Sequence, residues 1–258
     1  MNKKLIELKN NKEKILFIHY SCKSFDDENE CLSPRVTSIA VYYYDERAIK
    51  SFSFNIAAEV LHTSKEDIEN HYDEIEKKIL EDFFLFAKEH YDYYWIHWNM
   101  TSMNYGFDAL EHRYEVLTGT RPHHISEDKR YNLSKLIVFE YGKDYADDPK
   151  MKNLILLNWG KLPREYLEGQ DEIVAFENKD YIKMHKSTIE KVKFFRYIFI
   201  KLLHKEVKTK KKNWKLIFKE IFENPFIQML SLLSILITVG SGIVMLINWI
   251  YSFFLNYL

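Results

Sequence analysis

The stretch Ile15–Tyr20 (ILFIHY) follows a leader rich in lysine and asparagine and begins with four successive apolar residues. Such a short apolar run predicts a buried β-strand. The next two runs, Arg35–Tyr44 and Ala48–Ile56, are rich in Val, Ile, Tyr and Phe, and three charged residues separate them. This pattern predicts a β-hairpin. The soluble part of the chain is therefore expected to start with three strands.

A helix is expected to follow the hairpin. Thr63 and Glu66 have the spacing of a capping box, and apolar residues then recur every three or four positions to about His90. Tyr93–Trp98 has the pattern of a further strand. The remaining predicted elements are helices at Asp108–Leu117, Leu133–Tyr141 and about Asp171–Leu203. The order predicts an α/β domain in which three strands lead into a helix that crosses over to another strand.

Composition excludes several functional classes. The chain has 258 residues, enough for one sizeable domain and an anchor, and its formal net charge of -1 gives no general attraction to nucleic acid. Cys22 and Cys31 have neither CxxC nor zinc-ligand spacing, which fits free thiols in a reducing cytoplasm. No apolar N-terminal stretch resembles a signal peptide. No P-loop or GxGxxG motif supports nucleotide hydrolysis or dehydrogenase chemistry.

The C-terminal segment predicts a membrane span. No charged residue occurs from position 224 to the C-terminus. As a helix this segment would measure about 50 Å, against about 30 Å for the hydrocarbon core of a bilayer. One tilted helix with Trp249, Tyr251 and Tyr257 near the interfaces fits this length. A re-entrant hairpin that turns at Gly240–Gly242 is the alternative.

The residues before the span predict a basic amphipathic connector. Lysines crowd positions 201–219, and apolar residues recur there at helical spacing. Such a helix lies on an anionic membrane surface; its expected interfacial residues are Trp214, Lys208, Lys212, Lys215 and Lys219. A solvated basic linker is the alternative. Because the lysines precede the span, the positive-inside rule places the folded domain in the bacterial cytoplasm and the tail beyond the inner membrane.

Polar residues form a stripe along the predicted span. They recur mostly every three or four positions and comprise Gln228, Ser231, Ser234, Thr238, Ser241, Asn248, Ser252 and Asn256. In membranes, small and hydroxyl residues at this spacing typically mark helix–helix packing. A second interpretation claims more: several copies assemble with this face toward a water-filled pore. Both interpretations predict self-association, and only the second predicts conduction.

Asn104–Asp108 (NYGFD) follows a predicted strand. Its Asn-x-x-Phe-Asp pattern resembles the second motif of the ribonuclease-H-like DEDD 3′–5′ exonucleases. His185 and Glu190 have the spacing of the family's third motif, with Glu in place of Asp. The resemblance spans roughly 15–192. It implies a mixed sheet with flanking helices and a pair of Mg²⁺ or Mn²⁺ ions held by carboxylates.

The first motif of that family, Asp-x-Glu on the first strand, is altered here. His19 and Ser21 stand where the two acids belong. Because two-metal hydrolysis needs several close carboxylates, the domain is expected to be a pseudo-nuclease without a resident metal. If it were active, the candidate catalytic residues would be Asp108, His185 and Glu190. Further stretches of the soluble domain resemble a group of uncharacterised bacterial proteins. This resemblance implies a shared fold and no known activity.

A binding cleft is expected beside the strand ends, since this is the usual ligand cleft of the fold that the resemblance implies. Its candidate residues are His19, Ser21, Asn104, Asp108, Arg113 and His185. His97 and His112 are weaker members, and His97 is expected to satisfy a backbone carbonyl inside a buried strand. Cys22 with one of the histidines is a possible nucleophile, although a buried cysteine is usually a small apolar residue.

Three functional hypotheses follow for a chain divided into a domain (1–204), a connector (205–224) and a span (225–258). The first is an effector of a bacterial defence system. In it, a cytoplasmic protein partner or nucleic acid controls the domain, and the helices associate and permeabilise the inner membrane. The second is a membrane-tethered exonuclease that uses Mg²⁺ or Mn²⁺. The third is a passive scaffold that holds a cytoplasmic partner at the lipid bilayer.

Overall fold

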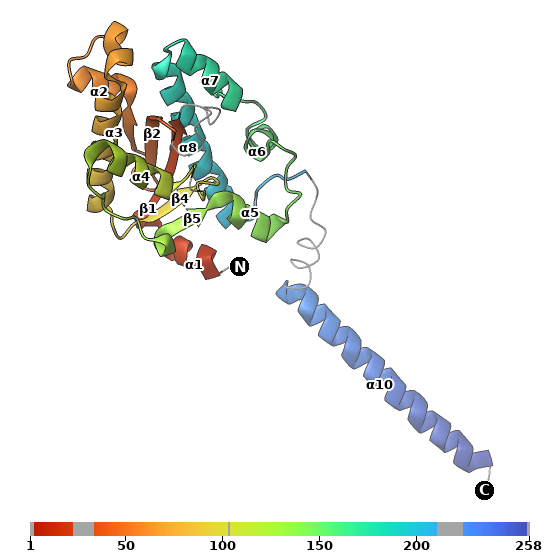
Figure 1. The fold of residues 1–258 in the computed structure, drawn as a ribbon. Coiled ribbons are helices and arrows are strands. Elements are labelled where there is room, and N and C mark those ends of the chain that lie inside the picture. Colours follow the sequence, from red (N-terminus) through yellow and green to blue (C-terminus); the bar gives the residue numbers. More distant parts are fainter. Residues whose placement is uncertain (1–2, 23–33, 103, 211–223, 257–258) are drawn as a thin grey trace. The chain divides into compact units, whose positions relative to one another are not determined.

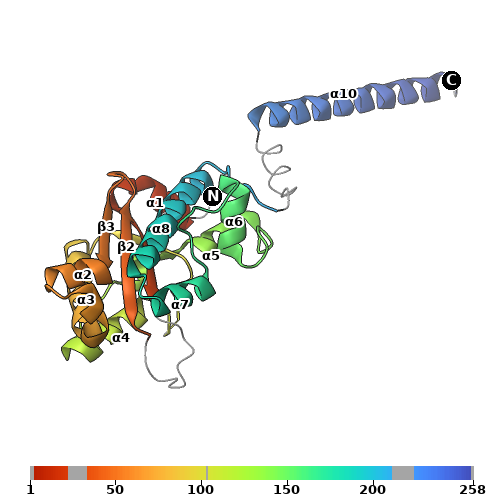
Figure 2. The same cartoon turned by 90° about the horizontal axis from the view of Figure 1, so that it is seen from above.

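A computed structural model describes residues 3–22, 34–102, 104–210 and 224–256. The chain divides into two compact units, Met1–Lys210 and Lys211–Leu258. The first unit is an α/β domain built on a 5-stranded mixed sheet with helices on both faces (Figures 1 and 2). In the second unit the described residues form one apolar helix.

The sheet has the strand order β3-β2-β1-β4-β5. β1 (Ile15–Cys22) pairs antiparallel with β2 (Val36–Tyr43), which pairs antiparallel with β3 (Ile49–Ser53). On its other side β1 is parallel to β4 (Tyr94–His97), which is parallel to β5 (Arg130–Asn132). Of the five described strands, β2 alone runs against the rest, and β1 lies at the centre.

Helices cover the two faces of the sheet. α2 (Phe54–Val60), α3 (Tyr72–Glu89) and α4 (Phe107–Thr118) pack on one face. The opposite face carries α1 (Lys3–Asn10), α5 (Leu133–Tyr141), α6 (Lys150–Trp159) and α8 (Tyr181–Leu203). α7 (Gly169–Glu177) buries Ala175 and Phe176 in the cluster of the first face, together with Tyr181 at the start of α8. Short 3-10 turns occur at Lys12–Lys14, Lys65–His71 and Glu127–Lys129. α8 packs along β1 and β2, and this placement brings its side chains to the end of β1.

The central strand explains why the sheet is covered on both faces. Leu16 and Ile18 of β1 pack into the cluster that includes α3, whereas Ile15 and Phe17 pack into the cluster that includes α8. The Phe17 ring lies 5.6 Å from the ring of Phe199 on α8. Because alternate side chains point to opposite faces, a strand buried on both sides needs a continuous apolar run. The prediction of a buried strand here is confirmed.

The order of strand, hairpin, helix and strand is confirmed, and three boundaries are wrong. The run Ala48–Ile56 is not one strand, because α2 begins at Phe54, which buries its ring beside α3. The predicted helix start is a separate 3-10 helix, Lys65–His71, and its cap is Ser64, whose side chain accepts from the Asp67 amide, rather than Thr63. α3 begins only at Tyr72. The long C-terminal helix is broken between α7 and α8. Lys179 there has φ 57°, a left-handed conformation that interrupts a helix.

Besides α2 and the short 3-10 turns, three elements were not predicted. β5 has only 3 residues, too few for any alternation to be recognised. α1 lies in a lysine-rich stretch with few apolar residues, whereas α6 contains the apolar run Leu154–Leu157 and was still missed. Leu5 and Leu8 of α1 are nevertheless fully buried beneath the sheet. α5, in contrast, has the predicted bounds.

The domain extends beyond the predicted boundary at residue 204. The Lys208 amide donates to Asn158 Oδ1 at 2.9 Å, and the Lys210 amide donates to the Tyr145 carbonyl at 2.9 Å. Val207 is buried. Lys208 therefore belongs to the folded domain instead of the predicted interfacial helix. The other predicted interfacial residues, Trp214, Lys212, Lys215 and Lys219, lie outside the described residues.

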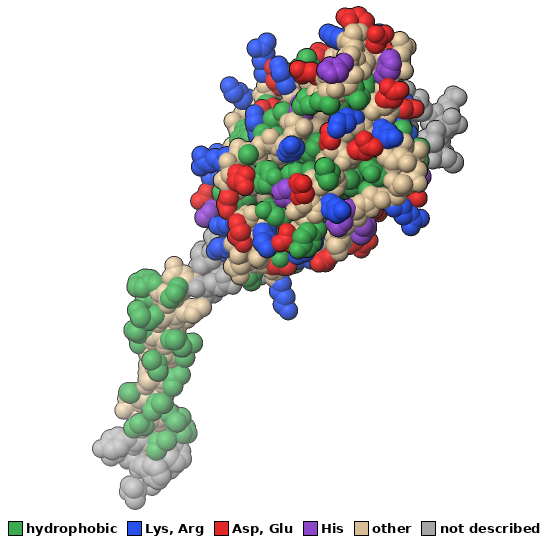
Figure 3. All heavy atoms as spheres, turned by 90° about the vertical axis from the view of Figure 1, so that its left-hand side faces the viewer, with side chains coloured by type: hydrophobic (Ala, Val, Ile, Leu, Met, Phe, Trp, Pro, Cys, Tyr) green, Lys and Arg blue, Asp and Glu red, His purple; other side chains and the backbone are tan. Residues whose placement is uncertain are grey.

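The described part of the second unit is α10 (Pro225–Asn256). Its stretch Pro225–Ile250 is long and apolar enough to cross a membrane. It carries no charged residue, whereas acidic and basic side chains are interspersed over the α/β domain (Figure 3). The helix runs unbroken through Gly240 and Gly242, so the re-entrant hairpin is wrong.

The hydroxyl groups of the polar stripe are bonded within α10. Ser231, Ser234, Thr238 and Ser241 each donate to a backbone carbonyl three or four residues earlier, at 2.7–2.9 Å. Hydroxyls in this geometry offer lipid no unsatisfied donor. The stripe is therefore compatible with an apolar environment as well as with a packed seam.

Candidate functional site

The first candidate site is a buried polar cluster at the end of β1, which we call the β1 cluster. It comprises Ser21 of β1, Ser38 of β2, Glu172 of α7, and His185, Thr188 and Lys191 of α8. β1 continues four residues beyond its last pairing with β4, and α8 covers this extension. The cluster thus joins elements that are distant in sequence at the predicted position of the cleft.

Hydrogen bonds connect the members of the β1 cluster. Ser21 Oγ lies 2.8 Å from Thr188 Oγ1 and 3.4 Å from Glu172 Oε1. The Thr188 hydroxyl also lies 3.1 Å from the Met184 carbonyl. The two hydroxyl protons thus serve three contacts, and either hydroxyl can be the donor between Ser21 and Thr188. This chain of bonds satisfies two hydroxyls that lie in the interior of the domain.

An ion pair occupies the centre of the β1 cluster. The Lys191 ammonium contacts Glu172 Oε1, the same carboxylate oxygen that Ser21 reaches. The two side chains are 7% and 14% exposed, so the pair is largely removed from water. A divalent cation beside Ser21 would have to approach this ammonium, and Coulomb repulsion in a poorly solvated site is strong. The pair therefore disfavours a metal ion at the end of β1.

Two buried histidines are neutral: His185, which belongs to the β1 cluster, and His19, which borders it. His185 Nδ1 lies 2.7 Å from Ser38 Oγ, and burial lowers the pKa of His185 to about 4. Burial and then the charge of Lys191 hold the pKa of His19 well below its ordinary value. Tyr105 donates its hydroxyl to the Tyr20 carbonyl, so the contact at 3.1 Å between His19 Nδ1 and that hydroxyl has His19 as the donor.

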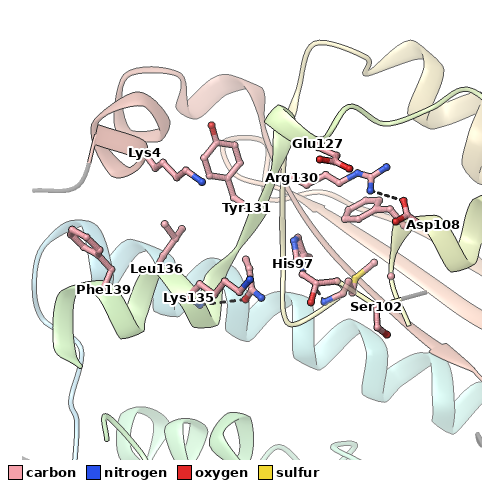
Figure 4. A pocket seen from close by; sticks show the side chains of 15 residues that line it. Lys4, His97, Ser102, Asp108, Glu127, Arg130, Tyr131, Lys135, Leu136 and Phe139 are labelled. Carbon is pink, nitrogen blue, oxygen red and sulfur yellow. Dashed lines mark hydrogen bonds and ion pairs between the residues drawn. The ribbon is translucent and has the colours of Figure 1, made fainter. Parts of the chain in front are cut away.

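The second candidate site is a cavity of about 570 Å³ at the carboxyl ends of the parallel strands β4 and β5, which we call the β4–β5 cavity (Figure 4). The beginnings of α4 and α5 border it. His97 lies at its base, and Asp108 and Arg130 lie on one wall, where Arg130 Nη1 is 2.8 Å from Asp108 Oδ1. Carboxyl ends of parallel strands commonly carry ligand sites in α/β proteins.

The structure distributes the predicted cleft residues over several places. His19, Ser21 and His185 lie in or beside the β1 cluster, and Asp108 lines the β4–β5 cavity. Asn104 is exposed in the loop between β4 and α4. His112 is exposed as well.

Arg113 and Glu190 are engaged elsewhere. Arg113 forms a two-point contact with Glu76 of α3, 2.8 Å from Oε1 and 2.7 Å from Oε2, and Glu76 is fully buried. That contact raises the pKa of Arg113 and fastens α4 to α3. Glu190 pairs with Lys193 at 2.7 Å on an outer face of α8. Within the described part of the chain, no group of three His, Cys, Asp or Glu residues is placed to hold a metal ion.

The expectation for His97 is corrected in chemical detail, whereas the buried Cys22 agrees with its interpretation as a small apolar residue. His97 is buried, but its Nδ1 accepts from the Met100 amide at 3.1 Å instead of donating to a backbone carbonyl. Burial raises the pKa of the Cys22 thiol to about 12, so a thiolate nucleophile is disfavoured at neutral pH.

Sequence reasoning assigned no role to Glu172, Lys191 or Ser38. His185, Thr188 and Lys191 recur at three-residue spacing, and Val192 and Phe195 continue that face of α8 into the core. The position of Lys191 on a helical face that is otherwise buried was therefore the signal that could have predicted its burial. Ser38 and Glu172 had no such signal, because their burial depends on strand pairing and on the position of α7.

Comparisons of this chain with models of protein families, with curated proteins and with solved structures found no match.

The neutral histidines predict acid sensitivity of the fold. The pKa of His185 is about 4 in the folded domain, below its ordinary value of about 6.5, so the unfolded chain binds more protons between these values. The free energy of unfolding is expected to fall as pH decreases through this window, by up to about 1.4 kcal/mol per pH unit for one histidine. Urea unfolding of the full chain in detergent, at pH 7 and pH 5, measures it.

The variant His185→Gln should reduce this pH dependence, whereas His112→Gln, at an exposed position, should leave it unchanged. If the free energy of unfolding changed equally with pH in the wild type and in His185→Gln, His185 would not be held neutral by burial.

The buried ion pair predicts strong coupling between its two members. Lys191→Met leaves the Glu172 carboxylate buried without its cation, and Glu172→Gln leaves the ammonium unpaired, so each should cost about 3–5 kcal/mol of stability. The double variant removes both charges and should cost clearly less than the sum of the two. Urea unfolding of the four proteins measures the coupling.

The pair Glu190 and Lys193 on the same helix is the matched control, since it is more exposed. In a double-mutant cycle with Glu190→Gln and Lys193→Met, the coupling energy between these two residues should be at most about 1 kcal/mol. Additive costs for Lys191 and Glu172 would contradict the assignment of the β1 cluster as a coupled unit.

Proposed function

We propose that this chain is a membrane-anchored effector of a bacterial defence system. Its cytoplasmic domain is a ribonuclease-H-like pseudo-nuclease that is controlled by a cytoplasmic protein partner or by nucleic acid. Its C-terminal helices self-associate and permeabilise the inner membrane. The observation that carries the proposal is the Lys191–Glu172 ion pair beside Ser21, in a chain that also contains α10.

The pseudo-nuclease part rests on chemistry at the end of β1. The succession of strand, hairpin, helix and parallel strand on which the exonuclease resemblance depends is present from β1 to β4. Two-metal hydrolysis needs carboxylates that are free to bind cations. Here His19 and Ser21 stand at the family's carboxylate positions, and the nearby Glu172 is already neutralised by Lys191. A domain with this set is better suited to recognition than to phosphodiester hydrolysis.

The membrane part rests on α10. Ser234, Thr238 and Gly242 repeat every four residues, so two helices can approach closely along this line. A passive anchor has no need for such a line. The link to defence rests on the architecture, because a recognition domain joined to an associating span is suited to damaging the cell's own membrane after a trigger.

The proposal predicts no nuclease activity. The purified full chain, incubated with labelled single-stranded DNA or RNA and Mg²⁺ or Mn²⁺, should leave the substrates intact on a denaturing gel. Metal-dependent degradation that is lost in Asp108→Asn, but kept in the exposed-acid control Asp45→Asn, would instead establish the membrane-tethered exonuclease.

The proposal also predicts leakage that depends on the stripe of α10. Full-length protein in vesicles should release an entrapped dye, and the release should rise more steeply than the protein-to-lipid ratio because several helices cooperate. Replacing Ser234, Thr238 and Ser241 by leucine should reduce release strongly. Since these hydroxyls bond to carbonyls of their own helix, the replacement breaks no contact to the rest of the described chain.

The matched control replaces Ile235, Val239 and Ile243 by leucine, at neighbouring exposed positions of the same helix. It should release dye like the wild type. The proposal would be wrong if the vesicles stayed intact at every protein-to-lipid ratio and cross-linking found only monomers. The passive scaffold would then be favoured.

A further inference from the structure

The β4–β5 cavity contains a hydrogen-bond donor that the fold leaves unused. His97 is 2% exposed, and its Nδ1 accepts from the Met100 amide at 3.1 Å. Burial lowers the pKa of His97 to about 3, so the ring is neutral and its proton is on Nε2. No described residue accepts a hydrogen bond from Nε2, and the ring lines the cavity (Figure 4). The geometry therefore presents an N–H group to a ligand.

The first turn of α4 adds backbone donors on the same side of the cavity. Gly106 precedes this 12-residue helix, and no side chain caps it. A Cβ atom at residue 106 would lie 2.8 Å from the Ser102 carbonyl, so the chain passes too close for any larger residue. The Gly106 amide already donates to the Tyr20 hydroxyl at 2.9 Å, so the backbone donors that remain are the amides of Phe107 and Asp108, two residues that line the cavity. Uncapped amides at a helix N-terminus attract an anion.

The charges around the cavity favour the same kind of ligand. Three basic side chains, Lys4, Arg130 and Lys135, and two acidic ones, Asp108 and Glu127, line it, which leaves a net positive charge. Arg130 is engaged with Asp108, with Glu111 and with the Ile125 carbonyl. Arg130 thus shares its one positive charge between two carboxylates, and the exposed Lys135 in the first turn of α5 is the cation available to an incoming anion.

The cavity also has an apolar end. Tyr131 of β5 and Leu136 and Phe139 of α5 line it away from Asp108 (Figure 4). Phe139 is 64% exposed, so its ring is open to a ligand. The volume of about 570 Å³ fits a small organic molecule.

We propose that the β4–β5 cavity binds a small organic phosphate, with the phosphate against His97 Nε2, the first turn of α4 and Lys135, and with the apolar body over Tyr131, Leu136 and Phe139. Donors of three kinds, from a ring, a backbone turn and an ammonium, match the several acceptor oxygens of a phosphate better than the two of a carboxylate. The proposal is independent of nuclease chemistry and of membrane leakage. The phosphate ester is either a free metabolite or a lipid headgroup.

The test is a calorimetric titration of the full chain, held in nanodiscs of phosphatidylcholine, with phenyl phosphate. Phenyl phosphate should bind more tightly than inorganic phosphate, which lacks the apolar body, and than benzoate, which lacks the phosphate. Lys135→Ala should weaken binding by about 10-fold, the usual effect of losing a charge-assisted hydrogen bond. Lys186→Ala, at an exposed lysine of α8, should bind like the wild type.

His97→Phe is the second variant, because it keeps a ring against Phe107 and removes Nε2–H. This variant should also bind phenyl phosphate more weakly. Its melting temperature shows whether the domain is folded. Absence of binding at about 10 mM, where even a weak site with a free energy near 3 kcal/mol would be occupied, would overturn the proposal. Unchanged affinity in Lys135→Ala and in a folded His97→Phe would overturn it as well.

A second titration in nanodiscs that contain phosphatidic acid identifies the source of the phosphate. If the natural ligand is a lipid headgroup, phosphatidic acid competes and the apparent affinity for phenyl phosphate falls. If it is a free metabolite, the affinity stays the same. Both results support a phosphate ester as the ligand. Competition assigns it to a lipid headgroup, and unchanged affinity assigns it to a free metabolite.

Discussion

The burial of polar side chains at the end of β1 is the constraint on which the arrangement of this domain depends. β1 lies at the centre of the sheet, and His19 and Ser21 are almost as buried as the apolar residues before them. Buried polar groups must be hydrogen-bonded, and β1 itself offers their side chains no partner. α8 supplies Thr188 to Ser21, and the loop after β4 supplies Tyr105 to His19. The positions of α8 and of this loop are thus linked to the same few atoms.

The same constraint separates structure from binding within the domain. In the β1 cluster, each charge and hydroxyl already has a partner, and the Lys191 ammonium stands beside the carboxylate of Glu172. A cluster that is satisfied internally holds elements together and has little left for a ligand. The β4–β5 cavity has the opposite character, because His97 and the first turn of α4 keep donors that no described side chain uses. Recognition therefore fits the cavity, and rigidity fits the cluster.

Sequence patterns predicted the elements whose burial is continuous and missed those whose burial depends on distant partners. The apolar run in Ile15–Tyr20 and the helical spacing before His90 identified β1 and α3. β5 has 3 residues and exists because it pairs with β4, so no local pattern reveals it. The site followed the same rule. The positions of His19, Ser21 and His185 were predictable from motif spacing, whereas Glu172 reaches Ser21 only because α7 turns back against α8.

The hydrogen bonding within α10 changes what its polar stripe means. A hydroxyl that donates to its own helix has little unsatisfied polarity, so Ser234, Thr238 and Ser241 do not by themselves force helices together. Interhelical hydrogen bonds in membranes are also modest, at about 0.6 kcal/mol on average. What distinguishes this face is size, since small residues and Gly242 allow close backbone approach. Association along α10 would therefore depend on van der Waals packing, which bulky side chains on this face prevent and small apolar ones preserve.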